Sequence, residues 1–390
     1  MKPVQSPDAL LTRRHWLLLG GVALSGCGGG GGGLVTALPG TGGTGAVFSQ
    51  GSITGFGSII INGVKFDDTQ ASVQIDGQNA LSSHLRLGMV AGVQGVRNGV
   101  DAVLGTLLGT ASAIEVWSIA QGPVSAATAA GFDVSGMHIQ TDNNTSLSGI
   151  SATTALADGQ TVKVWGLQAG PDGTQWAATR VEVVVASSLR VSSGLVHRLP
   201  SQVSLNGWTL AGAAVNGLSD GQVVRVQGIS GSAATLDVAA VKVLNAGFAT
   251  HASGDLEIEG FVTAVMTPQR FMIGPLTVDL PAVVAATLPR ALAVGDRLEA
   301  YGTWASGVLV ASKIEAEGSQ SRAIEIDAVI EQFTSVANFL LRSQRCDASQ
   351  ASFSHGQASS LRAGIRVKVE GVLLADVLLV SKLELAGTGN

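Results

Sequence analysis

The two cysteines are the residues of this chain whose positions indicate the most specific chemistry. Cys27 follows a basic start, which includes Arg13 and Arg14, and a short apolar run over residues 16–24. Such a run is too short to cross a bilayer as a mature helix and is typical of an export signal. Cys346 lies alone in a predicted strand region, where we expect a small buried side chain and not a nucleophile.

The residues next to Cys27 predict its role. Leu24-Ser25-Gly26-Cys27 resembles the lipobox of bacterial lipoproteins, which implies cleavage before Cys27 and acylation of its thiol. We expect residues 1–26 to be a signal peptide and the mature protein to be an exported cell-envelope lipoprotein, anchored in the outer membrane and facing the periplasm or the surface. Sec and twin-arginine export both stay open, as does an ordinary signal peptide with a chance cysteine.

Residues 27–49 are predicted to form a tether. Six consecutive glycines follow Cys27, and glycine-rich segments behave as flexible coils. A tether of roughly 20 such residues has a reach of about 25 Å, which suits a folded body held off a membrane.

Other reactive groups do not form known patterns. The histidines are scattered, and none pairs with Cys, His or a carboxylate at a spacing typical of a metal site. No nucleophile elbow or phosphate-binding loop occurs. We therefore predict no catalytic residue, no metal, no cofactor and no enzymatic activity. Asp67-Asp68 is a candidate cation contact, but turn capping is the favoured interpretation.

One pattern that occurs five times predicts the elements that make up the body. Two glycines enclose six residues with apolar side chains at the third and fifth positions, at 88–95, 159–166, 221–228, 295–302 and 364–371. This alternation predicts a half-buried strand in each copy. Asn62-Gly63 and Asn206-Gly207 lie between apolar runs and predict two-residue hairpin turns, whereas the fifth copy lacks a turn glycine.

The repeat predicts an all-β fold. Roughly five short strands per copy protect their edges best as small barrels of the oligonucleotide/oligosaccharide-binding (OB) type; a flat meander or a small sandwich is the alternative. We expect five tandem OB-like barrels joined by short linkers near 118, 188, 250 and 320. The predicted domains are repeat 1 (50–117), repeat 2 (118–187), repeat 3 (188–250), repeat 4 (251–319) and repeat 5 (320–390).

The opening of repeat 1 provides a family resemblance. The stretch from Gly55 to Phe66, which begins Gly-Phe-Gly-Ser, resembles the bacterial domain of unknown function 5666, which occurs as tandem copies in exported proteins. The resemblance is strongest in repeat 1 and implies an OB-like fold and export. It supplies no catalytic residues.

Two aromatic residues are candidates for ligand stacking. Trp165 and Tyr301 precede the second glycine of their copies, on the strand face opposite the core valines. Stacking on a sugar is one interpretation, and packing between neighbouring repeats is the other. Nucleic-acid binding is not expected, because the formal net charge is −5 and the chain has a single tyrosine.

We predict a non-enzymatic, lipid-anchored module that binds or supports components of the cell envelope. Its expected partners are the membrane, through the lipid, and a polysaccharide or an envelope protein. One alternative is a polysaccharide-binding protein that uses exposed barrel faces. The other is a hydrolase with a site between domains.

Overall fold

The computed structural model describes residues 45–102, 105–171, 173–231, 234–244, 254–316, 323–374 and 376–385. Cys27, the signal peptide and most of the tether lie outside these residues, as do the linkers near 250 and 320. The chain divides after Leu38, and residues 39–390 form one compact unit. Both sheets and all four hydrophobic cores lie in this unit, so it holds what its own folding requires.

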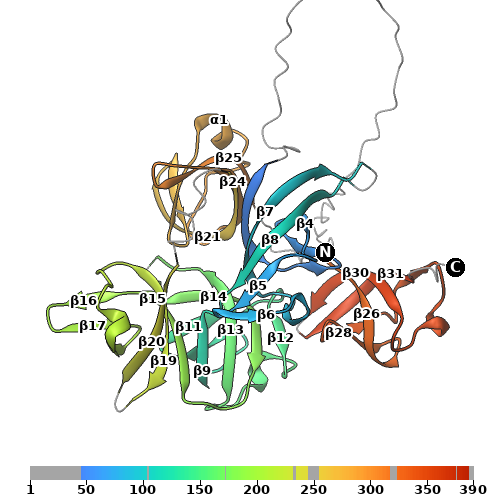
Figure 1. Cartoon of the computed structure of the whole chain (residues 1–390), viewed down its shortest axis with the longest axis horizontal. Coiled ribbons are helices and arrows are strands. Elements are labelled where there is room, and N and C mark those ends of the chain that lie inside the picture. Colours follow the sequence, from blue (N-terminus) through green and yellow to red (C-terminus); the bar gives the residue numbers. More distant parts are fainter. Residues whose placement is uncertain are drawn as a thin grey trace, which may run out of the picture. The chain divides into compact units, whose positions relative to one another are not determined.

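The described residues are almost entirely β-structure, which confirms the all-β prediction (Figure 1). Repeat 2 contains β9 (Ala120–Ser125), β10 (Gly131–Val134), β11 (Met137–Gln140), β12 (Ser146–Ser148), β13 (Thr161–Gln168) and β14 (Gln175–Val183). Repeat 4 contains β21 (Asp255–Thr267), β22 (Arg270–Ile273), β23 (Leu276–Asp279), α1 (Ala282–Ala285), β24 (Arg297–Ala305) and β25 (Val308–Ala316). Repeat 5 contains β26 (Ala323–Ser335), β27 (Asn338–Leu341), β28 (Gln344–Asp347), β29 (Ser352–Ser354), β30 (Arg366–Leu374) and β31 (Val377–Leu385).

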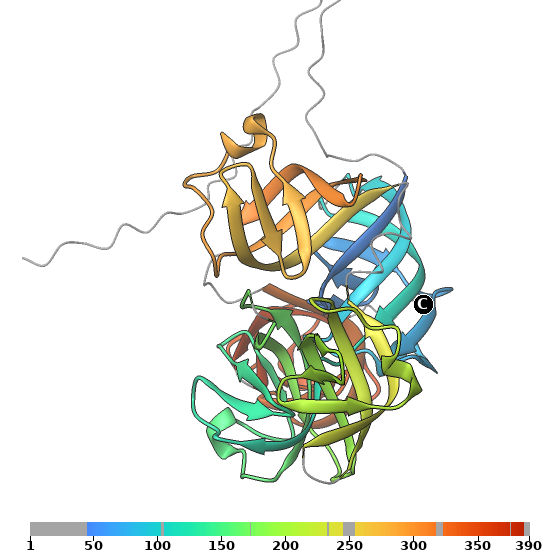
Figure 2. The same cartoon turned by 90° about the vertical axis from the view of Figure 1, so that its left-hand side faces the viewer.

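Repeats 2, 4 and 5 each close five strands into a ring. In repeat 4, β21 pairs antiparallel with both β22 and β24, β22 pairs with β23, and β24 pairs with β25. The ring is completed by β23 and β25, which run parallel. Figure 2 shows these curled strands in orange. Repeats 2 and 5 have the same pairing order.

Repeats 1 and 3 follow the same order, but their first strand is interrupted. Repeat 1 contains β1 (Ala46–Ser52), β2 (Gly55–Phe56), β3 (Ile59–Ile61), β4 (Val64–Asp67), β5 (Ser72–Ile75), β6 (Gln78–Ala80), β7 (Val90–Val100) and β8 (Leu107–Val116). Repeat 3 contains β15 (Leu189–Leu195), β16 (His197–Leu199), β17 (Gln202–Leu205), β18 (Trp208–Ala211), β19 (Val223–Ser230) and β20 (Thr235–Val243). Five equivalent OB-like barrels therefore stay a prediction. Since β1 begins at Ala46, the end of the predicted tether belongs to repeat 1.

Both glycines of the recurring pattern have a structural reason. The first glycine precedes the fourth strand of the ring (β7, β13, β19, β24 or β30). Its φ lies between +76° and +91° in all five copies, a region that favours glycine. The second lies at a β-bulge, where the pairing register shifts. A Cβ there would lie 2.1–2.3 Å from a carbonyl oxygen of the neighbouring strand, so a side chain is excluded.

The predicted hairpin turns are present. Asn62 and Gly63 have φ of 50° and 70°, and Asn206 and Gly207 have φ of 49° and 80°, as a type I′ turn requires. The Asn62 side chain also donates to Ser49 Oγ at 3.0 Å in the first strand. Repeat 5 forms its hairpin without glycine, since Arg342 and Ser343 both adopt positive φ.

The repeats pair with each other through their first strands. The first half of each first strand is bonded to the fourth strand of its ring on one side, and the ring leaves its other edge open. Through this edge β1 and β21 of repeat 4 pair in parallel, and β9 meets β15 at Gln121 and Val191. The open edge of β26 in repeat 5 pairs in parallel with β2, the second half of the first strand of repeat 1. Repeats 1 and 5 also share one hydrophobic core. The repeats are therefore joined by strand pairing and, for repeats 1 and 5, by a shared core.

The Gly-Phe-Gly-Ser opening of repeat 1 is the place where repeat 5 docks. A Cβ on Gly55 would lie 2.4 Å from the carbonyl oxygen of Glu325, and one on Gly57 would lie 2.5 Å from Cβ of Asp327. Phe56 between them is buried in the shared core. Only glycine permits this approach of β26 to β2.

Substitution of Gly55 tests this docking. Gly55→Ala should lower the free energy of unfolding of residues 39–390 by about 1–3 kcal/mol, because backbone on both sides must move. Gly217→Ala is the matched control, since no atom lies within 4 Å of its added Cβ. Urea unfolding measures both variants, and equal stability would contradict the close approach.

Candidate functional site

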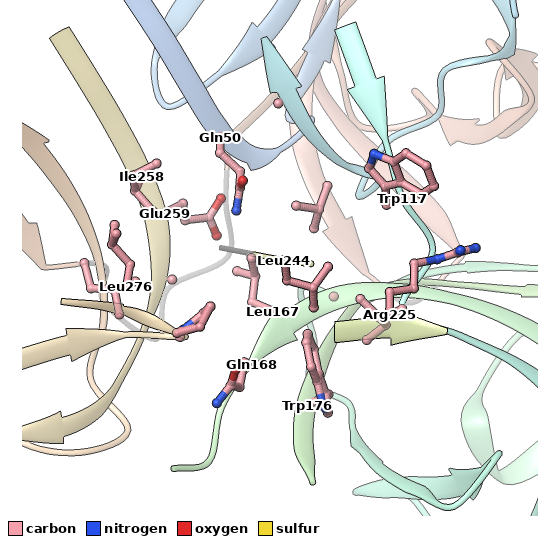
Figure 3. Close-up of a pocket in the computed structure, with 18 of the residues that line it drawn as sticks. Gln50, Trp117, Leu167, Gln168, Trp176, Arg225, Leu244, Ile258, Glu259 and Leu276 are labelled. Atoms are coloured by element: carbon pink, nitrogen blue, oxygen red, sulfur yellow. The ribbon is translucent and has the colours of Figure 1, made fainter. Parts of the chain in front are cut away.

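A cavity of about 120 Å³ lies where repeats 1 to 4 meet. Figure 3 shows Gln50 and Glu259 entering it from one side and Gln168 and Trp176 from the other. The first strands β1 and β21 bring repeats 1 and 4 to it, β13 and β14 carry the wall of repeat 2, and Arg225 and Leu244 come from repeat 3. The cavity thus depends on the pairing between repeats.

The walls of the cavity are mainly apolar. Leu167 is 6% exposed, and it follows the glycine of the bulge in β13. Trp176 on β14 is buried and donates its ring N–H to the Gly173 carbonyl at 2.8 Å. The hairpin turn of repeat 4, Ile273 to Leu276, covers the opposite side. The equivalent of Leu167 in repeat 3, Ile229, is 56% exposed, so only the position in repeat 2 is covered in this way.

Arg225 is a deeply buried charge at the cavity, and it is paired. Its side chain is 2% exposed; it donates to the Ser118 carbonyl at 2.6 Å and to Asp76 at 3.0 Å. Burial lowers the pKa of the guanidinium and the charge of Asp76 opposes this shift, so Arg225 remains cationic. Lys163 reaches the other oxygen of Asp76 at 2.6 Å. This cluster joins repeats 1, 2 and 3 at Ser118, where a short linker was predicted.

The other charges of the lining are also paired. Glu259 accepts from the Ser52 backbone N–H at 2.8 Å and from Arg297 at 2.6 Å. Lys242 bonds Glu115 at 2.8 Å and lies 4.2 Å from the ring centre of Trp117. Because Glu115 and Lys242 are 43% and 30% exposed, this end of the cavity reaches the surface.

Gln168 is the exception among the polar groups of the lining. The residue is 6% exposed, and its Nε2 donates to the Gly170 carbonyl at 2.9 Å. Its Oε1 is buried and accepts no hydrogen bond from any residue that the structure describes. Buried side-chain acceptors normally have a partner, and this oxygen departs from that rule.

The aromatic residues singled out in the sequence have different surroundings. Trp165 is 1% exposed and packs in the core shared by repeats 1 and 5, so its ring is not open to a sugar and stacking on it is withdrawn. Tyr301 donates to Glu299 at 2.7 Å and lies 3.1 Å from Glu315. Burial, with the charges of both glutamates, raises the pKa of its hydroxyl. Stacking on Tyr301 stays a prediction.

The remaining candidate residues act within the fold. Cys346 is buried, which raises the pKa of its thiol to about 12 and keeps it protonated. Asp67 accepts from the backbone and hydroxyl of Thr69, at 3.1 and 2.8 Å, as expected for turn capping. Across the described ranges, no three Cys, His, Asp or Glu side chains gather as a metal site would require. The same ranges include no helix with the length and apolarity to cross a membrane.

Sequence comparison gives one match. The model of the family described as "Domain of unknown function (DUF5666)" fits residues 121–182 and 259–315. Two stretches of the chain thus resemble DUF5666. They lie in repeats 2 and 4, the two repeats that face each other across the cavity, and not in repeat 1, where the resemblance was expected to be strongest. No curated protein matches the chain.

Removal of Arg225 tests the ionic junction beside the cavity. Arg225→Met should lower the free energy of unfolding by about 3–5 kcal/mol, because Asp76 and the Ser118 carbonyl lose a buried donor. Arg270→Met is the control, since Arg270 is half-exposed in its pair with Asp279 and should change stability little. If urea unfolding of residues 39–390 finds the two variants alike, Arg225 does not hold the repeats together.

Proposed function

We propose that this chain is a lipid-anchored, non-enzymatic protein of the bacterial cell envelope that binds a small, mainly apolar molecule between its repeats. The observation that carries the proposal is the cavity between repeats 1 to 4, with its apolar walls. Largely preformed, concave apolar sites with few polar groups are typical of small-molecule binding. The lipid anchor rests on the resemblance of Leu24–Cys27 to a lipobox.

Binding is favoured over catalysis by the state of the charged groups. Catalytic acids and bases need a free face toward the substrate and a pKa matched to proton transfer. At this cavity Arg225 and Glu259 are buried: Arg225 is held by Asp76 of repeat 1, and Glu259 by Ser52 of repeat 1 and by Arg297 of its own repeat. Their arrangement joins the repeats and leaves a neutral, apolar space.

The polysaccharide alternative has lost one of its two supporting residues, since Trp165 is buried. Tyr301 on β24 keeps its ring 4.9 Å from the ammonium of Lys313, and a glycan site there stays a prediction.

The anchor is tested at Cys27. Cys27→Ser should abolish incorporation of labelled fatty acid and move the protein from the membrane fraction to the soluble fraction. Cys346→Ala should leave both unchanged, because that thiol is buried in the body. Continued membrane association of the Cys27→Ser protein without an acyl label would contradict lipid anchoring.

The cavity is tested by filling it. Leu167→Trp should weaken toluene binding to residues 39–390 by about tenfold or more, because the ring occupies the space that the ligand needs. Ile229→Trp places the same ring at the equivalent, exposed position of repeat 3 and should leave binding unchanged. Ligand-observed NMR measures the dissociation constants, and circular dichroism checks that both variants fold. Equal binding by the two variants would place toluene elsewhere.

A further inference from the structure

We infer that a polar groove between repeats 1 and 5 binds a neutral oligosaccharide, with Arg342 and Asp68 as its central contacts. The groove consists of two hollows, of about 470 and 330 Å³, which meet at Ser58. Its lining residues differ from those of the cavity between repeats 1 to 4. The inference therefore goes beyond the proposed function and does not depend on it.

The larger hollow lies where β26 pairs with β2. A volume of about 470 Å³ falls within the range of small-molecule sites. Its lining is mainly polar and comes from both repeats: Ser58, Asp68, Thr69, Ser82 and Ser83 from repeat 1, and Asp327, Glu331, Arg342 and Arg366 from repeat 5. Hydroxyl, carboxylate and guanidinium groups thus meet in one place.

An unusual turn holds Arg342 in this lining. Arg342 and Ser343 form the hairpin turn of repeat 5 with φ of 51° and 59°, whereas the same turn includes a glycine in each of the other repeats. Left-handed backbone at residues other than glycine costs free energy and is concentrated at functional sites. The guanidinium carbon lies 4.3 Å from the ring centre of Phe56, and Nη2 donates to the Ser82 carbonyl at 2.6 Å.

Arg342 and Asp68 each bring an open polar group to the larger hollow. Among the residues that the structure describes, Arg342 Nη1 and the Asp68 carboxylate have no hydrogen-bond partner, and neither is enclosed, so solvent reaches both. Burial lowers the pKa of the guanidinium and the charge of Asp68 opposes this shift, yet the two side chains form no ion pair. A donor and an acceptor in the same hollow are therefore available to a ligand.

The charges of the larger hollow favour a neutral ligand. Arg366 bonds Asp327 at 2.8 Å, which leaves Asp68 and Glu331 with Arg342 as the remaining charges. An anion would meet two carboxylates and a cation would meet the guanidinium, and each would lose hydration. A hydroxyl group both donates and accepts, so neighbouring hydroxyls of a sugar can donate to Asp68 and accept from Arg342 Nη1.

The smaller hollow favours a chain of sugars over an amino acid, whose two charges could also satisfy Asp68 and Arg342. Lys65 of repeat 1 and Glu325 of repeat 5 form an ion pair at 2.8 Å in its lining. Uncharged polar groups such as the amide of Asn98 also line it. Because the polar lining continues past Ser58, an extended ligand can use both hollows, whereas an amino acid would occupy only one.

A panel of neutral trisaccharides composed of glucose, galactose, mannose or rhamnose tests this class of ligand, with acetate and glycine as charged probes. We expect residues 39–390 to bind at least one trisaccharide, and to bind it about tenfold or more tightly than either charged probe. Ligand-observed NMR titration measures all the dissociation constants on the unaltered protein, so this comparison does not depend on a variant that must fold.

Arg342→Met and Asp68→Ala assign the binding to the groove. Each should weaken the tightest-binding trisaccharide by about tenfold or more, the range of one hydrogen bond to a charged group. Arg345→Met and Asp158→Ala are the matched controls, because both side chains are exposed outside the groove, and they should leave binding unchanged. Circular dichroism checks the fold of every variant, and Asp68→Ala removes a side chain that holds no partner in place.

Three results would overturn this inference: binding of no trisaccharide in the panel, tighter binding of acetate or glycine, or trisaccharide binding that survives both Arg342→Met and Asp68→Ala. Tighter binding of glycine would assign the groove to amino acids instead. None of these results bears on toluene binding in the cavity between repeats 1 to 4, so failure of this inference is distinguishable from failure of the proposed function.

Discussion

The unpaired edge of the first strand is the constraint on which this structure depends. In each ring the first half of that strand bonds the fourth strand on one side only, which leaves backbone N–H and C=O groups open on the other. Exposed strand edges attract other strands and are normally covered. Here β1 and β21 cover each other over Val47–Gln50 and Asp255–Ile258, and β2 covers β26. Tandem repeats thereby solve within one chain a problem that a single small barrel would leave to its surroundings.

The other features of the junction follow from this pairing. Bringing β1 against β21 places Arg97 of repeat 1 beside Glu257 of repeat 4, a buried ion pair. It also brings the hairpin turn of repeat 4 toward the bulge of β13, where Leu167 is covered and the cavity forms. A closed barrel packs its interior with its own side chains, so the space between barrels is where a ligand site can arise without loss of core packing.

The sequence predicted the features that repeat locally. These features depend on backbone geometry within a few residues, and the structure contains each of them: the alternating valines, the Asn62-Gly63 turn and the two glycines of each copy. Partners far apart in the chain could not be predicted in this way. Asp76 and Arg225 belong to different repeats, and Glu259 is held by Ser52 of another repeat. The alternation along its strand predicted that Trp165 faces away from the core of its own repeat, but a neighbouring repeat buries that face. Nothing in the sequence singled out Gln168 beyond its place after the bulge.

The central claim is that one ligand contacts two repeats at once, because the pairing of first strands creates its site. Intermolecular nuclear Overhauser effects from the ring protons of bound toluene to methyl-labelled residues 39–390 test this claim most directly. We predict contacts to Leu167 of repeat 2 and to Leu276 of repeat 4 in the same complex. Contacts confined to the methyl groups of a single repeat would contradict the account.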